Sequence, residues 1–294
     1  MPIAEIPYFD VIIIGAGLSG VGAAYHLQHD CPEKTFVVLE GRGALGGTWD
    51  LFRYPGIRSD SDMYTLGFPF YPWKNPQAIA DGSAILEYIQ DTVKTFYLDQ
   101  YIRFNHKVSR AEWSSETKKW TLQIQSNDHI SHPTIQCSFL FACSGYYDYD
   151  QGYEPSFEGS ETFQGRIIHP QKWPTDVSYA TKKVIVVGSG ATAVTLVPEL
   201  AQQAAEVVLL QRSPTYIVSL PRKDVVANFF KKILPAGMAH SLIRWKNIFF
   251  SQIFYQASRA LPKVIKGIIQ KGIRKELGEN FDMQHFNPDY KPWD

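Results

Sequence analysis

Residues 9–20, FDVIIIGAGLSG, join an apolar, β-branched run to a glycine-rich turn. The run is typical of a buried strand in a parallel sheet. It leads into a G-x-G-x-x-G sequence formed by Gly15, Gly17 and Gly20. In such a turn the first glycine permits the tight bend, the second lets a pyrophosphate approach the backbone, and the third lets helix and strand pack closely. An Ala-rich stretch at 21–28 then predicts a helix.

A second apolar run, residues 36–39, ends at Glu40, twenty residues after Gly20. An acidic side chain at this place accepts hydrogen bonds from ribose hydroxyls and repels a 2′-phosphate. The strand–helix–strand unit therefore predicts a site for FAD or NAD rather than for NADP. The alternative is a glycine turn in an α/β domain that binds no nucleotide. The strand, the helix and Glu40 together disfavour that alternative.

The same pattern returns at residues 183–194, KVIVVGSGATAV, with alanine in place of the last glycine. A helix is expected at 194–201, and the apolar run 207–210 ends in Gln211-Arg212-Ser213. Arg212 stands where the first unit has Glu40, and an Arg can fork onto a phosphate. The first unit therefore suits FAD and the second suits NADPH. A chain with both is most simply a flavin reductase or oxygenase, and a duplicated domain with one inactive site is the alternative.

Three further segments have ordinary interpretations when each is taken alone. GGTWD at 46–50 is a glycine turn, and RYPGIRSDSD at 53–62 is a polar surface loop with Asx turns. FQGRIIHPQKWP at 163–174 lies between the two nucleotide units, where His169 and Trp173 would be packing residues of a linker.

Residues 163–174 nevertheless match the F-x-G-x-x-x-H-x-x-x-W-P fingerprint of Baeyer–Villiger monooxygenases. Related N-oxygenating flavin monooxygenases usually carry Tyr or Phe at the position of Trp173. The chain resembles the Baeyer–Villiger family over nearly its whole length, and most of all the branch of ethionamide-activating monooxygenases, through residues 49–64, 143–147 and 211–216. The resemblance implies an α/β flavoprotein with two dinucleotide-binding, Rossmann-like domains. The FAD domain would span 1–150, with inserted β-structure at about 102–140, and the NADPH domain 151–294, with a helical insertion at about 221–278.

The resemblance also implies the site residues. FAD would be held by Gly15, Gly17, Ser19, Gly20, Glu40, Gly47, Thr48, Trp49, Asp50 and Leu51, with Val108 near the adenine. Arg58, Ser59 and Asp60 would lie between flavin and nicotinamide. NADPH would be held by Gly188, Ser189, Gly190, Ala191, Thr192, Ala193, Val194, Arg212 and Ser213. Asp60 would orient an active-site Arg. Because they lie between the two nucleotide fingerprints, we expect His169 and Trp173 to form a hinge between the nucleotide units.

In this family NADPH reduces FAD, and O₂ then gives a C4a-peroxyflavin that inserts oxygen beside a ketone carbonyl to form an ester or lactone. Thioethers and thioamides are S-oxygenated instead. The family's active-site Arg follows shortly after a segment like residues 288–294, PDYKPWD, where this sequence ends. We therefore expect a truncated, N-terminal part that alone binds FAD weakly, aggregates and forms no ester. The rival interpretations are an N- or S-oxygenating monooxygenase, a plain flavin reductase or oxidase, and an inactive cofactor-binding fragment.

Charge and composition indicate which partners and which location to expect. The formal net charge of zero gives no indication of a nucleic-acid partner, and Cys31, Cys137 and Cys143 have no metal-site spacing. The first ten residues lack the basic start of a signal peptide, which predicts a cytoplasmic protein. Residues 225–275 contain ten Lys and Arg but no Asp or Glu, interleaved with apolar residues. Two interpretations stay open for this region: a helical pair that packs on further polypeptide, or a peripheral membrane surface.

Overall fold

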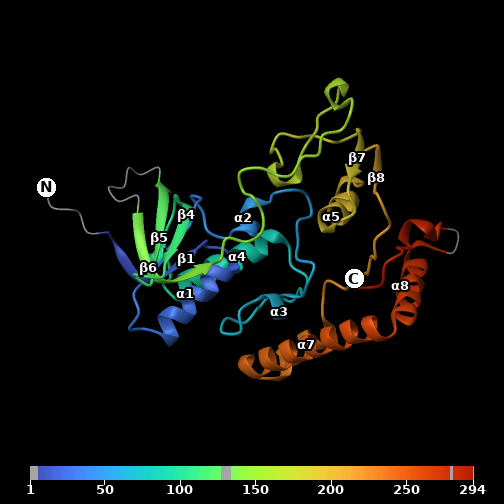
Figure 1. Cartoon of the computed structure of the whole chain (residues 1–294). Coiled ribbons are helices and arrows are strands. Elements are labelled where there is room, and N and C mark those ends of the chain that lie inside the picture. Colours follow the sequence, from blue (N-terminus) through green and yellow to red (C-terminus); the bar gives the residue numbers. More distant parts are fainter. Residues whose placement is uncertain (1–5, 127–133, 279–280, 294) are drawn as a thin grey trace. The chain divides into compact units, whose positions relative to one another are not determined.

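The computed structural model describes residues 6–126, 134–278 and 281–293 (Figure 1). By its contacts the chain divides into two compact units. The first unit comprises Met1–Arg53 and Gly82–Trp173, and the second comprises Tyr54–Asp81 and Pro174–Asp294. Residues 54–81 thus group with the second unit, although they lie inside the predicted FAD domain. The predicted cofactor-domain boundaries stay a prediction. Residues 127–133 of the expected inserted β-structure and Asp294 of the C-terminal segment lie outside the described residues.

The first unit is built on a six-stranded sheet with the order β3-β2-β1-β6-β5-β4. Its parallel part contains β1 (Tyr8–Ile14), β2 (Phe36–Leu39), β3 (Ile102–Arg103) and β6 (Thr134–Ala142). Its antiparallel part adds β5 (Lys119–Ser126) and β4 (His106–Ser114). Trp113 and Trp120 face each other across the β4–β5 hairpin that their positions predicted, and β6 returns beside β1 as expected.

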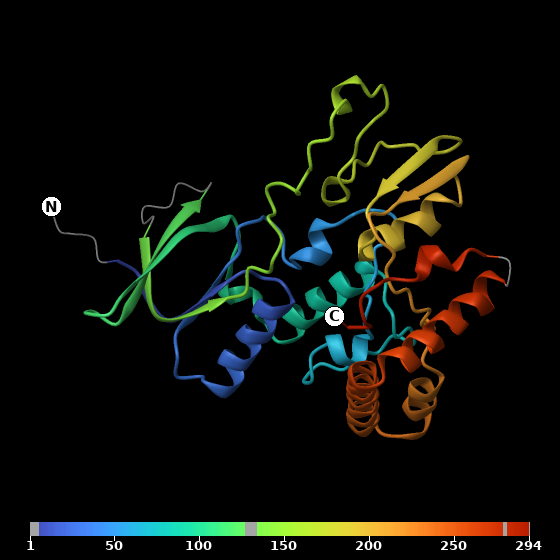
Figure 2. The same cartoon turned by 45° about the vertical axis from the view of Figure 1, so that its right-hand side comes forward.

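Three helices accompany this sheet: α1 (Leu18–Asp30), α2 (Thr48–Leu51) and α4 (Gly82–Thr95). Helix α1 contacts β1, β2 and α4 (Figure 2). The β-branched run of β1 is buried as predicted, with Ile12 and Ile13 fully inaccessible. On β6, however, Phe139 is 55% and Phe141 38% exposed.

The rest of the first unit, after β6, contains two short 3₁₀ helices, η2 (Ser160–Thr162) and η3 (Pro170–Lys172). A further 3₁₀ turn, η1 (Asp99–Tyr101), precedes β3. These irregular segments place the His169 and Trp173 fingerprint, which flanks η3, at the end of the first unit.

The second unit contains a two-stranded parallel sheet, β7 (Lys183–Val187) and β8 (Glu206–Leu210), with α5 (Ala191–Leu200) as the connecting helix. Both α1 and α5 begin inside the glycine turns, three residues earlier than the sequence pattern predicted. The second glycine of each fingerprint, Gly17 or Gly190, is the N-cap of the helix. One face of the β7–β8 sheet is open, with Ile185 62% and Leu210 56% exposed.

The predicted helical region is confirmed as three helices of the second unit: α6 (Val225–Ile233), α7 (Ala236–Ala260) and α8 (Pro262–Leu277). Pro235 lies at the start of α7 and Pro262 at the start of α8, where proline is favoured because its missing N–H is not needed. Helix α7 contacts α6, α8 and the short helix α3 (Met63–Leu66), and η4 (Met283–Phe286) follows α8. Among the described residues, none of these helices is both long and apolar enough to cross a bilayer.

Candidate dinucleotide-binding sites

The turn after β1 has the geometry that a nucleotide fingerprint requires. Gly15 has a φ of +102°, and a Cβ there would lie 2.6 Å from the carbonyl oxygen of Cys143. A Cβ on Gly20 would lie 1.8 Å from the carbonyl oxygen of Gly15. At Gly17, by contrast, the nearest atom to such a Cβ is the Cα of Gly47 at 3.6 Å. The first and third glycines are therefore required by the fold itself, whereas the second keeps space free beside the backbone.

The same turn leaves the start of α1 open to an anion. Gly17 is the N-cap of this 13-residue helix, and within the described chain no side chain caps its amides and no acidic residue occupies its first turn. Free amide groups and the helix dipole make such a terminus a site for phosphate groups. The residues present thus fit the pyrophosphate of a dinucleotide.

Glu40 is held at the end of β2 by bonds that the sequence did not reveal. The side chain is only 4% exposed, and its Oε2 accepts from the amide of Ala16 at 2.8 Å while Oε1 accepts from the amide of Arg42 at 2.9 Å. The carboxylate therefore fixes the fingerprint turn in place. Its two oxygens offer about four acceptor positions, so capacity for ribose hydroxyls remains.

The predicted FAD loop at 46–51 lies directly against the fingerprint turn. A Cβ on Gly47 would approach the Cα of Gly17 to 3.1 Å and the hydroxyl of Tyr149 to 3.2 Å. Arg42 binds Asp50 at 2.5 Å and donates to the carbonyl of Gly47 at 3.3 Å, which locks the loop around α2. The loop thus meets the fingerprint turn through Gly47 and Gly17, while the assignment of Thr48, Trp49, Asp50 and Leu51 to FAD stays a prediction.

Arg42 and Tyr149 were missed at the sequence level. Burial raises the pKa of the Tyr149 phenol, and a hydrogen bond with the side chain of Thr48 partly offsets this rise. The Arg42 guanidinium lies 5.7 Å from the centre of the Tyr149 ring. Arg42 lies between Gly41 and Gly43, and Tyr149 lies in a polar segment after β6, but neither stretch matches the nucleotide fingerprints, so the sequence did not single them out.

Val108 lies on β4 beside the strand end that carries Glu40. Two residues earlier, the amide of His106 donates to the carbonyl of Glu40 at 2.8 Å. Val108 itself is half-buried and packs against the core around Ile12 and Leu39. Its assigned place near an adenine stays a prediction.

In the second unit, the loop with Arg58, Ser59 and Asp60 is anchored at its middle residue. Ser59 is 2% exposed; its amide donates to the carbonyl of Ala80 at 2.8 Å, and its hydroxyl accepts from the amide of Ala80 at 3.1 Å. Arg58 forms an antiparallel bridge with Asp81 and is half-buried, whereas Asp60 is exposed. A carboxylate at this exposed position is free to orient another group.

The residues before this loop contact the second fingerprint. Burial raises the pKa of the Tyr54 phenol, while a hydrogen bond with the side chain of Thr192 opposes the rise. A Cβ on Gly56 would lie 2.4 Å from the Cγ of Glu199, on α5. The structure therefore joins residues 54–60 to the helix of the predicted NADPH site, a link that the sequence did not indicate.

The second fingerprint turn is less crowded than the first. Gly188 has a φ of +130°, and no described atom lies within 4 Å of a Cβ built there or on Gly190. Gly190 caps α5 without help from a described side chain, and the first turn, with Ala191, Thr192, Ala193 and Val194, carries no acidic residue. Ser189 precedes this cap, and Arg212 and Ser213 are exposed after β8. This arrangement also fits a dinucleotide, with Arg212 at the edge where its strand ends.

The His169–Trp173 fingerprint is tied to the segment that follows β6. A Cβ on Gly152 would lie 2.1 Å from the Cε1 of His169, so the imidazole packs directly on that backbone. The amide of Gln171 donates to the Nδ1 of His169 at 3.3 Å, and the buried Gln171 side chain donates to the carbonyl of Asp148. The chain passes from the first unit to the second directly after Trp173. The hinge assignment stays a prediction.

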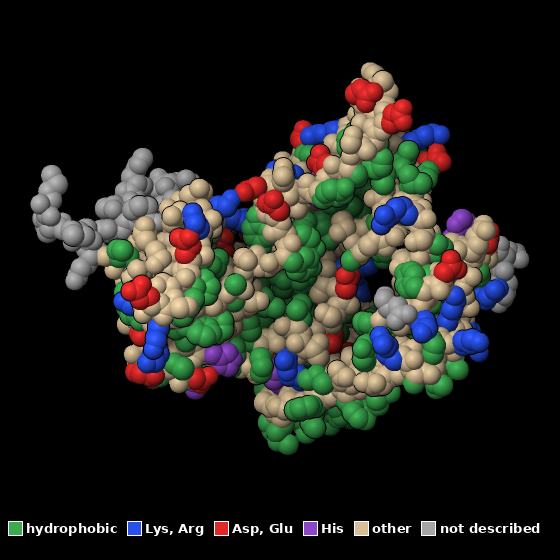
Figure 3. Space-filling model, viewed as in Figure 1, with side chains coloured by type: hydrophobic (Ala, Val, Ile, Leu, Met, Phe, Trp, Pro, Cys, Tyr) green, Lys and Arg blue, Asp and Glu red, His purple; other side chains and the backbone are tan. Residues whose placement is uncertain are grey.

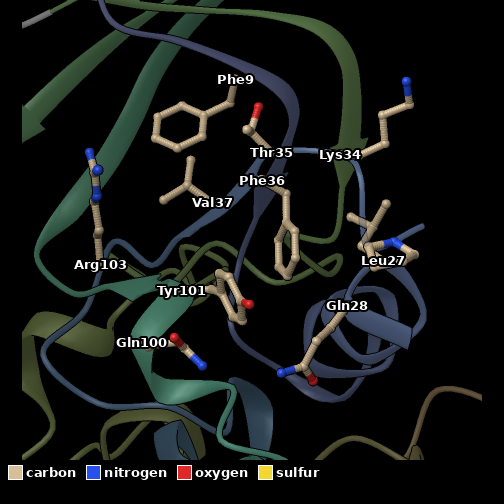
Figure 4. A pocket seen from close by; sticks show the side chains of 11 residues that line it. Phe9, Leu27, Gln28, Lys34, Thr35, Phe36, Val37, Gln100, Tyr101 and Arg103 are labelled. Atoms are coloured by element: carbon tan, nitrogen blue, oxygen red, sulfur yellow. The ribbon is translucent and has the colours of Figure 1, made fainter. Parts of the chain in front are cut away.

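A pocket of about 470 Å³ in the first unit lies elsewhere on the sheet (Figure 4). It is lined by residues at the beginnings of β1 and β2 and by the end of α1, among them Phe9, Phe36, Leu27, Tyr101 and Arg103. Gly15 and Glu40 follow the opposite ends of the same two strands. The pocket contains none of the predicted cofactor residues and is separate from the dinucleotide turns.

Comparison with known proteins agrees with this geometry. The family model described as "Flavin-binding monooxygenase-like" matches residues 10–253. The chain is 53% identical to the FAD-containing monooxygenase EthA of Mycobacterium tuberculosis, covering 98% of this chain and 59% of that protein. It is 46% identical to the probable FAD-binding monooxygenase AlmA of Acinetobacter baylyi, covering 98% and 58%. The chain therefore spans about three-fifths of the length of these curated relatives.

Solved structures with the same fold point in the same direction. A steroid monooxygenase bound to NADP superimposes with a TM-score of 0.65 at 28% identity, covering 76% of this chain and 42% of that one. The enzyme OTEMO in complex with FAD and NADP gives a TM-score of 0.62 at 26% identity, covering 74% and 41%. These matches confirm the predicted fold class of a two-dinucleotide α/β flavoprotein. The chain belongs to the flavin-binding monooxygenase-like family.

Proposed function

We propose that this chain supplies the FAD- and NADPH-binding part of a Baeyer–Villiger monooxygenase, which inserts one oxygen atom of O₂ beside a ketone carbonyl. The observation that carries the proposal is the contrast between the two nucleotide turns. A buried carboxylate, Glu40, stands at the first, and an exposed guanidinium, Arg212, stands at the corresponding strand end of the second. One chain thus carries one site suited to FAD and another suited to NADPH.

The residues of the first unit would bind and orient FAD. The open N-terminus of α1 at Gly17 would receive the pyrophosphate, Glu40 the ribose, and the loop at 46–51 the flavin side of the molecule. Bound FAD supplies the redox and oxygen-transfer chemistry, while the protein supplies orientation and electrostatics. In the second unit, the N-terminus of α5 with Arg212 and Ser213 would hold NADPH.

Asp60 would act by orienting a cation, and the anchored Ser59 beside it would keep that carboxylate in place. A cation near developing negative charge lowers the barrier, and removing one such group typically costs about 10²–10³ in rate. His169 and Trp173 would couple the position of the NADPH-binding unit to this chemistry. The substrates would be small ketones, with thioethers or thioamides as S-oxygenation substrates; one of the solved relatives is a cyclohexanone monooxygenase with cyclohexanone bound.

Product analysis tests the proposed reaction directly. The chain, extended by the remaining C-terminal part of its EthA relative, is loaded with FAD, reduced by NADPH without oxygen, and then given O₂ with either cyclohexanone or a thioether. We expect a lactone from the ketone and a sulfoxide from the thioether. Sulfoxide without lactone would favour an N- or S-oxygenating enzyme, and H₂O₂ alone from the extended chain would favour a reductase or oxidase.

Charge reversal at Arg212 tests the second nucleotide site. In the same extended chain, Arg212→Glu replaces attraction for the 2′-phosphate by repulsion, which is worth about 1–3 kcal/mol, or about fivefold to 150-fold in binding. We expect the ratio of KM values for NADH and NADPH to fall by that factor. Lys182→Glu, which makes the same charge change next to the beginning of β7, is the matched control and should leave the ratio unchanged. An unaltered ratio in Arg212→Glu would remove Arg212 from the site.

A further inference from the structure

The outward faces of α6 and α7, two helices in contact within the second unit, both carry exposed apolar side chains. On α7 these side chains lie at helical spacing: Met238, Leu242, Trp245, Phe249 and Ile253, which we call the α7 stripe. Each is at least 48% exposed, and Trp245 reaches 69%. On α6, Val225, Phe229 and Ile233 are exposed by 56% or more. Exposed apolar residues gathered in this way mark an interaction surface rather than the scattered apolar residues of an ordinary surface.

The opposite side of α7 already has partners within the unit. Ala239 and Ile243 are buried there. The Arg244 guanidinium donates to the carbonyls of Tyr64, Thr65 and Gly67 at 2.8–3.2 Å, and the Asn247 amide donates to Asp62 at 2.9 Å. Helix α7 is therefore held in place by its inner face. The α7 stripe lies on the other side of the helix and does not take part in this packing.

The charged side chains between residues 225 and 275 have a single sign. Among the ten cations between residues 225 and 275, Lys231, Arg244, Lys246 and Lys266 are at most half-buried and bind carbonyls or Asp224. The other six are exposed: Lys232, Arg259, Lys263, Lys271, Arg274 and Lys275. No Asp or Glu occurs in this range. Figure 3 shows hydrophobic side chains along the lower edge of the molecule over α7 and Lys and Arg side chains over α8.

We propose that the α7 stripe and the outward face of α6 bind the surface of an anionic lipid bilayer. An amphipathic helix rests with its apolar side at the boundary of headgroups and acyl chains, where Trp is favoured, while long cationic side chains reach the headgroups. A second copy of this surface would bring the same exposed cations against it, so mostly like charges would meet. A bilayer rich in anionic lipid provides the opposite charge together with an apolar layer.

Flotation with vesicles through a density gradient, which leaves aggregated protein behind, tests this proposal on the 294-residue chain and on the chain extended by the C-terminal part of its EthA relative. Vesicles of phosphatidylcholine with phosphatidylglycerol at equal amounts should bind the chain, and pure phosphatidylcholine vesicles should bind it at least tenfold more weakly. The double variant Trp245→Gln/Phe249→Gln should lose at least tenfold in partitioning to the anionic vesicles, because two large side chains no longer enter the apolar layer. Ile167→Gln in the first unit, exposed to the same extent at 68%, is the matched control and should bind like the unchanged chain.

The electrostatic part is tested separately on α8. Each cation near an anionic surface contributes about fivefold to binding, so Lys271→Glu/Lys275→Glu should weaken binding to anionic vesicles by at least tenfold. The variant should leave the weak binding to phosphatidylcholine unchanged. Lys94→Glu/Lys118→Glu, at two exposed positions of the first unit, makes the same change in net charge and serves as its control.

Fluorescence quenching adds a test that needs only a conservative variant, so a folding defect does not imitate its result. Brominated acyl chains in the anionic vesicles should quench part of the tryptophan fluorescence of the unchanged chain. This part should disappear in Trp245→Phe, which keeps an aromatic side chain and should still bind. Equal binding to both kinds of vesicle, or quenching that persists in Trp245→Phe, would overturn the proposal. So would a dimer that Trp245→Gln/Phe249→Gln dissociates without any binding to vesicles, because that result assigns the surface to a second copy.

Discussion

Gly20→Ala is expected to destabilise the first unit by about 3 kcal/mol or more and to abolish flavin binding. The added Cβ would lie 1.8 Å from the carbonyl oxygen of Gly15 and 3.4 Å from a side-chain atom of Ile13. Neither neighbour can yield easily. The amide of Gly15 bonds to Leu39 at 2.8 Å, and Ile13 is fully buried. Relief of the clash therefore requires α1 to move away from β1, at a cost above the usual range of about 1–3 kcal/mol for overpacking by a side chain.

Helix propensity alone predicts that Gly20→Ala raises the stability of the first unit. Replacing a helical glycine by alanine stabilises by about 0.5–1 kcal/mol where space allows. Gly267, inside α8, has no described atom within 4 Å of a built Cβ, so Gly267→Ala should show this gain. Urea unfolding and flavin content are measured side by side for Gly20→Ala and Gly267→Ala. A loss in the first variant and a gain in the second would show that the steric clash at Gly20 outweighs helix propensity. A Gly20→Ala chain that keeps its stability and its flavin would contradict the assigned geometry.

The elements that the sequence predicted correctly are those whose signal is local. The apolar run of β1, the glycine turn, α1 and β2 follow one another within 31 residues, from Phe9 to Leu39, and each is specified by its own neighbours. The hairpin between Trp113 and Trp120 is local in the same sense. Period and turn chemistry are read over a few residues, so these parts needed no knowledge of the rest of the chain.

The parts that the sequence did not predict depend on contacts between distant residues. Tyr54 meets Thr192 across 138 positions, and Arg244 meets Tyr64 across 180. Because of such contacts, residues 54–81 group with the second unit although they follow the first fingerprint in sequence. A polar side chain that bonds a distant carbonyl leaves no periodic pattern, so Arg244 looked like one more cation of a basic helix. The packing of α7 on this segment became visible only in three dimensions.

The sequence predicted the position of Glu40 but not its hydrogen bonds. Its carboxylate accepts from the amides of both Ala16 and Arg42 in a buried place. Glu40→Gln keeps the shape but leaves one acceptor oxygen, so an amide N–H of the new side chain must face a backbone N–H. Losing one charged hydrogen bond and leaving a buried donor unpaired should cost about 2–4 kcal/mol in the free energy of unfolding. Ribose binding should weaken as well, by about tenfold or more, because the stronger ionised acceptor is gone.

Two measurements distinguish the roles of this carboxylate. Urea unfolding of the chain without flavin reports the bonds to Ala16 and Arg42, and equilibrium titration with FAD reports the ribose contact. Glu116→Gln, in the exposed turn of the β4–β5 hairpin, removes the same charge and should change neither. If Glu40→Gln lowers stability while FAD affinity stays unchanged, the carboxylate serves only to shape the turn. The preference for FAD over a 2′-phosphorylated dinucleotide would then need a cause other than Glu40.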